Sequence, residues 1–228
     1  MNVRKLLARL NPSIARFEVH HGGQPELTPQ DIAGALGMID DRLAREVLCT
    51  VWWPDGAQLQ RAELDRIVRE AQLREWMRLR RELEAAKLAL HVAQDDIDGT
   101  YGTRAGQRAS LQRAAETLDE VKARQWPAVG PIYRAVRVAV LAELATPSLC
   151  PHCEGRGEVF VQDRLLICQH CEGHGRTPVS DRKRAAMIER DEAGYRRVWR
   201  PVYEWTLALC AGAETRGARA LERALAPA

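Results

Sequence analysis

Four cysteines between residues 150 and 171 have the type and spacing of a metal site. Cys150 and Cys153 form one Cys-x-x-Cys pair, Cys168 and Cys171 form another, and each pair with its following x-Gly-x-Gly is here called a knuckle. A spacing of two residues lets both thiolates of a pair turn toward one ion, and two pairs complete a tetrahedral zinc site. Four protein ligands leave no open position, so we expect one structural Zn²⁺. The glycines fit this site because the chain must curl after each pair, which favours positive φ.

Two disulfides or a redox-active pair are the alternatives for these cysteines, and a doubled motif fits both poorly. A secreted disulfide scaffold would be shorter and would spread its cysteines more evenly. We expect His152, His170 and His174 at the surface or facing phosphate, because four thiolates already suffice for zinc. Cys49 and Cys210 stand alone, and we expect both to be small buried apolar side chains.

Length and composition limit the class of protein. The chain has 228 residues, which suits one large or two small domains, and 46% of them are hydrophobic. No segment approaches the roughly 20 apolar residues of a membrane span, and Met1–Lys5 is charged with no apolar stretch behind it. We therefore expect no membrane partner, no signal peptide and a cytoplasmic location. The Walker A, Gly-x-Ser-x-Gly and His-Glu-x-x-His patterns do not occur, so we expect no catalysis.

The first helical signal begins at Thr28. This residue is the expected N-cap, and Pro29 occupies the first helical position. Apolar residues from Ile32 to Val47 then recur at intervals of three or four, which predicts one helix. We expect that helix to end near Trp52, because Pro54 biases the residue before it away from helix.

A long helical hairpin is predicted next. Residues 58–96 are rich in strong helix formers, and apolar residues in their second half step by sevens. Gly99–Gly106 interrupts this rhythm, which resumes over residues 111–125. Two antiparallel helices packed on each other, with a glycine-rich tip, explain the pattern most simply, and a role in reaching a partner is the alternative.

The remaining residues predict short elements around the knuckles. A helix spans about 131–145, and Val159–Val161 and Leu165–Ile167 predict a two-stranded ribbon between the two cysteine pairs. After the second knuckle, Ser180 is the expected N-cap of a helix over 181–190. A final helix begins or kinks near Pro201.

Positive charge concentrates after the second knuckle. Between residues 176 and 200 the basic residues are Arg176, Arg182, Lys183, Arg184, Arg190, Arg196, Arg197 and Arg200, and the acidic ones are Asp181, Glu189, Asp191 and Glu192. The whole chain has a formal charge of +3, and four thiolates with one Zn²⁺ would lower it to +1. A zinc site beside DNA therefore needs flanking cations. The local excess fits a nucleic-acid surface and an ordinary solvated helix face equally well.

Two families share these motifs. The knuckles resemble the zinc region of the Hsp40 (DnaJ-type) chaperones, but that family normally carries four repeats and a J domain with His-Pro-Asp, whereas this chain has two repeats and no His-Pro-Asp. The order of motifs resembles the lambda-type phage antitermination protein Q family more closely. The matching motifs are Asp31–Met38, Thr146-Pro147, both knuckles with their glycines, Pro178-x-Ser180, Arg200–Glu204 and Cys210. The resemblance is nearly continuous over residues 131–225 and weaker over 28–50, and the hairpin over 85–130 departs from it.

This resemblance implies both a function and a fold. Members of the family bind a DNA element overlapping a phage late promoter, engage paused RNA polymerase holoenzyme with its sigma subunit, and travel with it through terminators. Nascent RNA at the exit channel is a further candidate partner. The family has a helix-turn-helix-like DNA-binding region interrupted by the zinc loop. We therefore expect a predominantly α protein of the bacterial host's cytoplasm, a helical bundle with a small Cys₄ zinc ribbon inserted in a helix-turn-helix-like region.

Carried onto this chain, the first helix of that region spans about 131–145 and the recognition helix starts at Ser180. The expected DNA-contacting residues are Arg134, Arg137, Arg176, Ser180, Arg182, Lys183, Arg184, Arg196 and Arg197. Residues 182–184 are the candidates for base contacts, because the first turns of a recognition helix reach base edges in the major groove. Arg176, Arg196 and Arg197 are candidates for phosphate contacts. Since each helical residue turns about 100°, one of the three consecutive cations should point away.

The sequence thus predicts three segments and leaves two functions open. Residues 1–56 form an N-terminal helical segment, 57–130 the long hairpin, and 131–228 the zinc-containing DNA-binding region with the C-terminal helices. The preferred function is transcription antitermination. The alternative is a zinc-stabilised protein-interaction or chaperone-like module without DNA binding.

Overall fold

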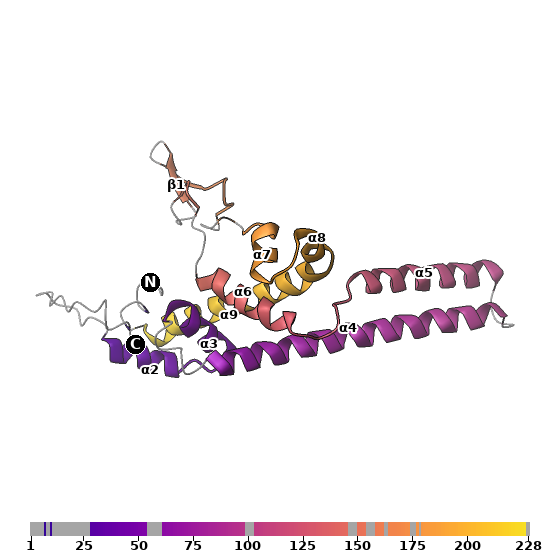
Figure 1. The fold of residues 1–228 in the computed structure, drawn as a ribbon, viewed down its shortest axis with the longest axis horizontal. Coiled ribbons are helices and arrows are strands. Elements are labelled where there is room, and N and C mark those ends of the chain that lie inside the picture. The colour runs from indigo at the N-terminus through magenta and orange to yellow at the C-terminus, as the bar shows by residue number, and fades with distance from the viewer. Residues whose placement is uncertain are drawn as a thin grey trace, which may run out of the picture.

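The computed structural model describes residues 7, 10, 28–53, 61–98, 103–145, 150–153, 158–161, 164–173, 177 and 179–226. Over these ranges the fold is predominantly helical (Figure 1). In chain order the elements are α2 (Pro29–Gly37), α3 (Arg42–Trp52), α4 (Arg61–Asp98), α5 (Arg104–Ala123), α6 (Ile132–Ala145), β1 (Glu158–Val161), β2 (Arg164–Ile167), α7 (Asp181–Met187), α8 (Glu192–Gly194), the π-helix η2 (Tyr195–Trp199) and α9 (Arg200–Ala224). None of the helices in these ranges is long and apolar enough to cross a membrane.

The single helix expected over residues 28–52 is wrong, because the structure has α2 and α3 with a turn between them. Thr28 caps α2 as predicted, in a reciprocal capping box with Asp31. The chain leaves the helix after Gly37, and the Asp41 carboxylate then accepts a hydrogen bond from the Ala44 N–H at 3.0 Å to start α3. Ile39 lies in the turn but is buried in the same apolar cluster as its neighbours. The apolar spacing therefore continues through the break, which is why periodicity alone missed it.

Helix α3 packs closely against α9 and also contacts α4 and α6. The closest approach is at Gly217, where an added Cβ would lie 2.8 Å from the Ala44 carbonyl oxygen. Glycine is needed there because any side chain would push the two backbones apart. The main core is shared by α3, α4, α6 and the helices after the knuckles. It gives α6 and α9 a fixed scaffold.

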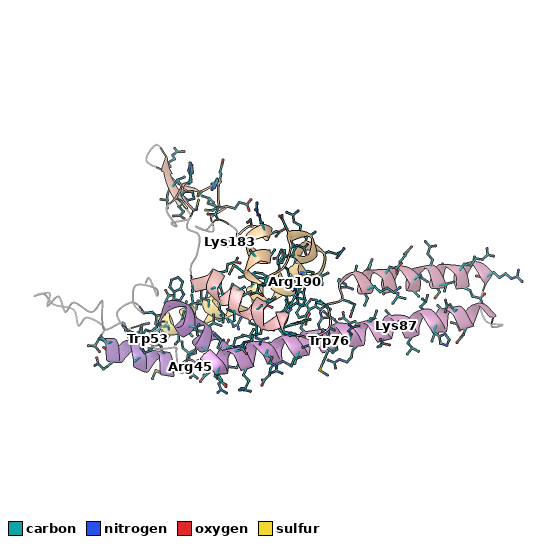
Figure 2. All side chains as sticks on the ribbon, in the orientation of Figure 1. Arg45, Trp53, Trp76, Lys87, Lys183 and Arg190 are labelled. Carbon is teal, nitrogen blue, oxygen red and sulfur yellow. The ribbon has the colours of Figure 1, made fainter. Side chains whose placement is uncertain are left out.

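The predicted hairpin is present as α4 and α5, which run side by side away from the body (Figure 1). Its own small core consists of Leu83, Ala86, Leu118 and Val121. At its base the Trp76 indole N–H donates to the Pro127 carbonyl at 3.0 Å. Figure 2 shows Trp76 where α4 leaves the body and Lys87 farther out along the hairpin. Residues 99–102 of the expected glycine-rich tip lie outside the described residues.

Of the helices predicted after the knuckles, the first ends earlier than expected and the last begins where expected. Helix α7 is shorter than the expected 181–190, because it stops at Met187 and Glu189 adopts a left-handed φ of 56°. The last helix, α9, begins at Arg200 with Pro201 in its first turn, as predicted, and it follows α8 and η2 without a gap. The π-helix ends just before Pro201, which has no N–H to donate, and the Arg200 N–H bonds the Tyr195 carbonyl five residues back. The predicted beginning or kink near Pro201 thus corresponds to the junction between the π-helical turn and α9.

Candidate metal centre and cationic surface

The four knuckle cysteines come close enough together to share one metal ion. Their sulfur atoms all lie within 4.8 Å of one another, and all four residues are buried. The Sγ atoms of Cys150 and Cys168 are 3.9 Å apart, and those of Cys153 and Cys171 are 3.6 Å apart. A tetrahedron with Zn–S distances of about 2.3 Å has sulfur–sulfur edges of about 3.8 Å. The cluster thus has room for a metal ion such as zinc at its centre.

The disulfide alternative does not occur in this structure. All six cysteines of the chain are free thiols, and the sulfur separations in the cluster are far above the roughly 2.05 Å of a disulfide bond. Among the described residues these four cysteines form the only group of three or more acidic, histidine or cysteine side chains able to hold an ion. Thiolate sulfur at this count and spacing suits Zn²⁺ better than the hard cations Mg²⁺ and Ca²⁺.

A two-stranded sheet connects the two cysteine pairs. Strands β1 and β2 are antiparallel, with Glu158 opposite Ile167, so residues 158–161 and 164–167 run side by side. Because the chain reverses direction from one strand to the other, the pairing leads back to Cys168 and Cys171 beside the first cysteine pair. The two strands occur where the sequence predicts them, each beginning one residue earlier.

The second knuckle curls as its glycine predicts. Glu172 and Gly173 have φ values of 52° and 85°, and the Gly173 N–H donates to the Cys168 carbonyl at 3.2 Å. An added Cβ at Gly173 would meet the Ile167 side chain at 3.2 Å, so this position favours glycine on both counts. Gly155, Gly157 and Gly175 lie outside the described residues.

His152, His170 and the two isolated cysteines take the places expected for them. His152 and His170 are exposed, with ring centroids 6.2 Å apart, and neither belongs to the sulfur cluster. His174 lies outside the described residues. Cys49 and Cys210 are buried in the helical body. Burial raises the pKa of the Cys49 thiol to about 11 and that of Cys210 to about 12, so both stay protonated and unreactive near neutral pH.

Of the three consecutive cations on α7, Arg184 is the one that points away from solvent. Its Nε and Nη2 donate to the two oxygens of the Glu143 carboxylate on α6, at 3.0 and 2.6 Å. The Tyr203 hydroxyl on α9 donates to the same carboxylate at 2.8 Å. Arg182 and Lys183 are exposed, and no ion pair holds either of them within the described part of the chain. The guanidinium of Arg184 therefore links α7 to α6 through an ion pair. Its expected role as a base contact is corrected, because the side chain is engaged inside the protein.

Arg137 is also engaged inside the protein. Its side chain is 6% exposed, Nε and Nη2 donate to the two carboxylate oxygens of Asp65 at 2.7 and 3.1 Å, and Nη1 donates to the Gln72 carbonyl oxygen at 3.0 Å. The Gln72 amide in turn donates to Thr206 on α9 at 2.9 Å. This network ties α6 to α4 and α9, so an outward DNA contact by Arg137 is also corrected. Arg134 is exposed, with no ion-pair partner in the described ranges.

The other expected DNA contacts divide between capped, paired and free side chains. Ser180 accepts a hydrogen bond from the Lys183 N–H at 3.3 Å and caps α7 as predicted. Arg196 is paired with Asp181 at 3.0 Å and with Glu192 at 2.5 Å. Arg197 is exposed and, as far as the structure describes the chain, unpaired. Arg176 lies outside the described residues.

Three exposed cations without an ion-pair partner in the described ranges therefore remain on α7 and η2, namely Arg182, Lys183 and Arg197. Figure 2 shows Lys183 and Arg190 on the lobe of short helices formed by α7 and α8. Arg190 donates to the Glu189 carbonyl at 3.2 Å, so only part of its donor capacity is free. Asp181 offsets charge at the start of α7 by pairing with Arg196.

Sequence reasoning missed two features of this region, the acidic partners of the buried arginines and the exposed apolar residues of β2. Glu143 and Asp65 decide which arginines turn inward, and no local pattern marks them, because their partners lie 41 and 72 residues away. It also did not single out the exposed side chains of Leu165, Leu166 and Ile167 on β2. The signal was available, since three consecutive aliphatic residues in a two-stranded sheet cannot all face one covered side.

No protein family model, no curated protein and no solved structure matches this chain.

Proposed function

We propose that this protein is a phage late-gene transcription antitermination factor. It binds a DNA element overlapping a late promoter, loads onto RNA polymerase holoenzyme with sigma paused nearby, and makes the polymerase read through terminators in the cytoplasm of the bacterial host. The observation that carries the proposal is the buried Cys₄ cluster preceding a helix with free, exposed cations at Arg182 and Lys183. The order of motifs around these residues supports it.

In this proposal α6 and α7 are the two helices of a helix-turn-helix-like region, and the knuckles with β1 and β2 are a zinc ribbon inserted between them. The contacts between α6 and α7 support this arrangement, because the Arg184–Glu143 ion pair holds the two helices together. Arg182 and Lys183 then contact the major groove, and Arg197 contacts phosphate. Arg196 contributes less, since Asp181 and Glu192 already balance its charge.

A terminator readthrough assay tests the proposal directly. The template carries the phage late promoter upstream of an intrinsic terminator, and transcription uses the purified RNA polymerase holoenzyme of the host. We expect readthrough with the wild-type protein and none with Cys150→Ser, which removes one proposed zinc ligand. Cys49→Ala is the matched control, because it removes a cysteine outside the cluster. Absence of readthrough with the wild-type protein on its own promoter would overturn the proposal.

DNA binding is tested separately with promoter duplex. Arg182→Ala combined with Lys183→Ala should abolish specific binding, whereas Arg74→Ala combined with Arg81→Ala, two exposed arginines on α4, should leave it in place. Binding of the wild-type protein should weaken steeply between low and moderate salt, because each phosphate contact releases counterions. Equal effects of the two double substitutions would show that only overall charge matters.

One observation favours the alternative function, a protein-interaction module held together by zinc. Leu165, Leu166 and Ile167 on β2 are 56%, 48% and 67% exposed, so large aliphatic side chains are open to a protein partner on both faces of this strand. If the wild-type protein shows neither specific promoter binding nor readthrough, this alternative becomes the preferred function.

A further inference from the structure

A cavity of about 470 Å³ lies between α4 and the start of α6, outside the metal cluster and outside the surface of α7 and η2. Three arginines line it, Arg69 from α4 and Arg134 and Arg137 from α6, together with one acid, Asp65. The volume falls in the range of about 300–1,000 Å³ that small-molecule sites occupy. A cavity lined by three cations and one acid favours an anionic ligand.

The inner wall of the cavity is a fixed, buried hydrogen-bond network. Arg137 uses three of its five N–H groups, two on the Asp65 carboxylate and one on the Gln72 amide oxygen. One N–H on each terminal nitrogen remains for a ligand. Gln72 is 1% exposed and is itself held by Thr206, so the guanidinium of Arg137 cannot rotate freely. A donor fixed in this way is preorganised for an acceptor that enters the cavity.

The charges leave a net attraction for an anion at the mouth. Asp65 faces the same cavity, but its two oxygens are occupied by Arg137, which balances its charge. Arg69 and Arg134 are exposed, and neither has an ion-pair partner in the described part of the chain. Gly130 and Pro131, which precede the 14-residue helix α6, line the cavity too. The positive end of the α6 dipole therefore adds to the attraction that Arg69 and Arg134 exert on an anion.

We propose that this cavity binds a phosphate group carried by a ligand of about mononucleotide size. Arg69 and Arg134 take the phosphate oxygens from the mouth, and Arg137 supplies its remaining N–H groups from the wall, a planar-donor arrangement suited to phosphate. The side chains of Leu73 and Val129 also line the cavity and offer apolar contact to the rest of the ligand. A free phosphate ester and the backbone of a nucleic acid both present this chemistry.

The test is calorimetric titration of the full chain with inorganic phosphate, AMP and adenosine at low salt. We expect AMP to bind at least about tenfold more tightly than adenosine, since hydrogen bonds to a charged group account for that difference. Arg69→Ala combined with Arg134→Ala should weaken AMP binding about tenfold or more. The matched control, Arg74→Ala combined with Arg81→Ala, removes equal charge from α4 residues that do not line the cavity and should leave AMP binding unchanged. Equal affinity for AMP and adenosine, or equal losses in the two double variants, would overturn the proposal.

Competition with short duplex DNA separates the two sources of phosphate. If AMP displaces the duplex, the cavity takes a backbone phosphate, and if AMP binds without displacing it, the ligand is a free phosphate ester; both outcomes support the site. The cavity stands apart from the proposed function. If AMP still binds but the protein gives no readthrough, only the antitermination proposal is overturned. If the protein gives readthrough but Arg69→Ala combined with Arg134→Ala leaves AMP binding unchanged, only the phosphate-site proposal is overturned.

Discussion

Arg184 and Glu143 lie 41 residues apart in the chain, and their side chains form a two-pronged ion pair between α7 and α6. Both side chains are almost fully buried, and Tyr203 donates a third hydrogen bond to the same carboxylate. The guanidinium also lies over the Tyr203 ring, 5.2 Å from its centroid. The pair thus joins three helices and orients α7, so that Arg182 and Lys183 remain outside.

Loss of Glu143 should therefore be costly. Glu143→Ala leaves a buried guanidinium and a buried hydroxyl without their acceptor, and we expect the free energy of unfolding to fall by about 3 kcal/mol. The control is Glu204→Ala, which breaks the exposed Arg200–Glu204 pair and should lower the free energy of unfolding much less, because solvent screens an exposed pair. Urea denaturation followed by circular dichroism measures both. Equal decreases in the free energy of unfolding would mean that the buried pair stabilises the fold no more than the exposed one.

Two glycines of α9 should respond to alanine in opposite directions. Gly217→Ala places a methyl group 2.8 Å from the Ala44 carbonyl oxygen, and we expect a loss of about 1–3 kcal/mol in the free energy of unfolding. At Gly212 the new Cβ meets only the far end of the Arg216 side chain, at 3.5 Å. Alanine should stabilise the helix there by about 0.5–1 kcal/mol. Thermal unfolding of both variants would contradict this packing if Gly217→Ala were neutral.

Metal content should follow the knuckle cysteines alone. Protein purified without chelators should carry one zinc per chain, measured by elemental analysis, and Cys168→Ser should lose it. Cys49→Ala should keep the metal, since Cys49 is no part of the sulfur cluster. Chelation should leave most of the helical circular dichroism intact, because the apolar core of the helices does not include the cluster. Full metal content in Cys168→Ser would refute the four-sulfur site.

Thiol labelling should separate the six cysteines into two classes. At pH 8 the native, metal-loaded protein should react slowly with iodoacetamide at every cysteine. After chelation the four knuckle cysteines should react, whereas Cys49 and Cys210 should not, because burial raises their pKa values to about 11 and about 12 and keeps them protonated. Denaturant should expose all six. Mass spectrometry counts the labels, and rapid labelling of Cys210 in the native state would contradict its burial.

The sequence alone determined the features that a few neighbouring residues specify. Thr28 and Ser180 are helix caps because each side chain bonds a backbone N–H three residues on, and the structure confirms both. The two Cys-x-x-Cys pairs predicted their own meeting, since four thiolates at that spacing can share one ion and the intervening strands pair. The α4–α5 hairpin followed from helix-forming residues on both sides of a glycine-rich segment.

Only the tertiary structure decided which arginines are available. Arg182 and Arg184 have the same chemistry and lie two residues apart, but two helical steps of about 100° each turn their side chains to opposite sides of α7, so that Arg184 meets Glu143 and Arg182 stays in solvent. Arg137 is likewise held inside the protein, by an ion pair with Asp65, 72 residues away. The break between α2 and α3 was hidden because Ile39 keeps the apolar rhythm while it packs in a turn. Such contacts depend on how distant segments pack against each other, and the spacing of neighbouring residues in the sequence does not specify that packing.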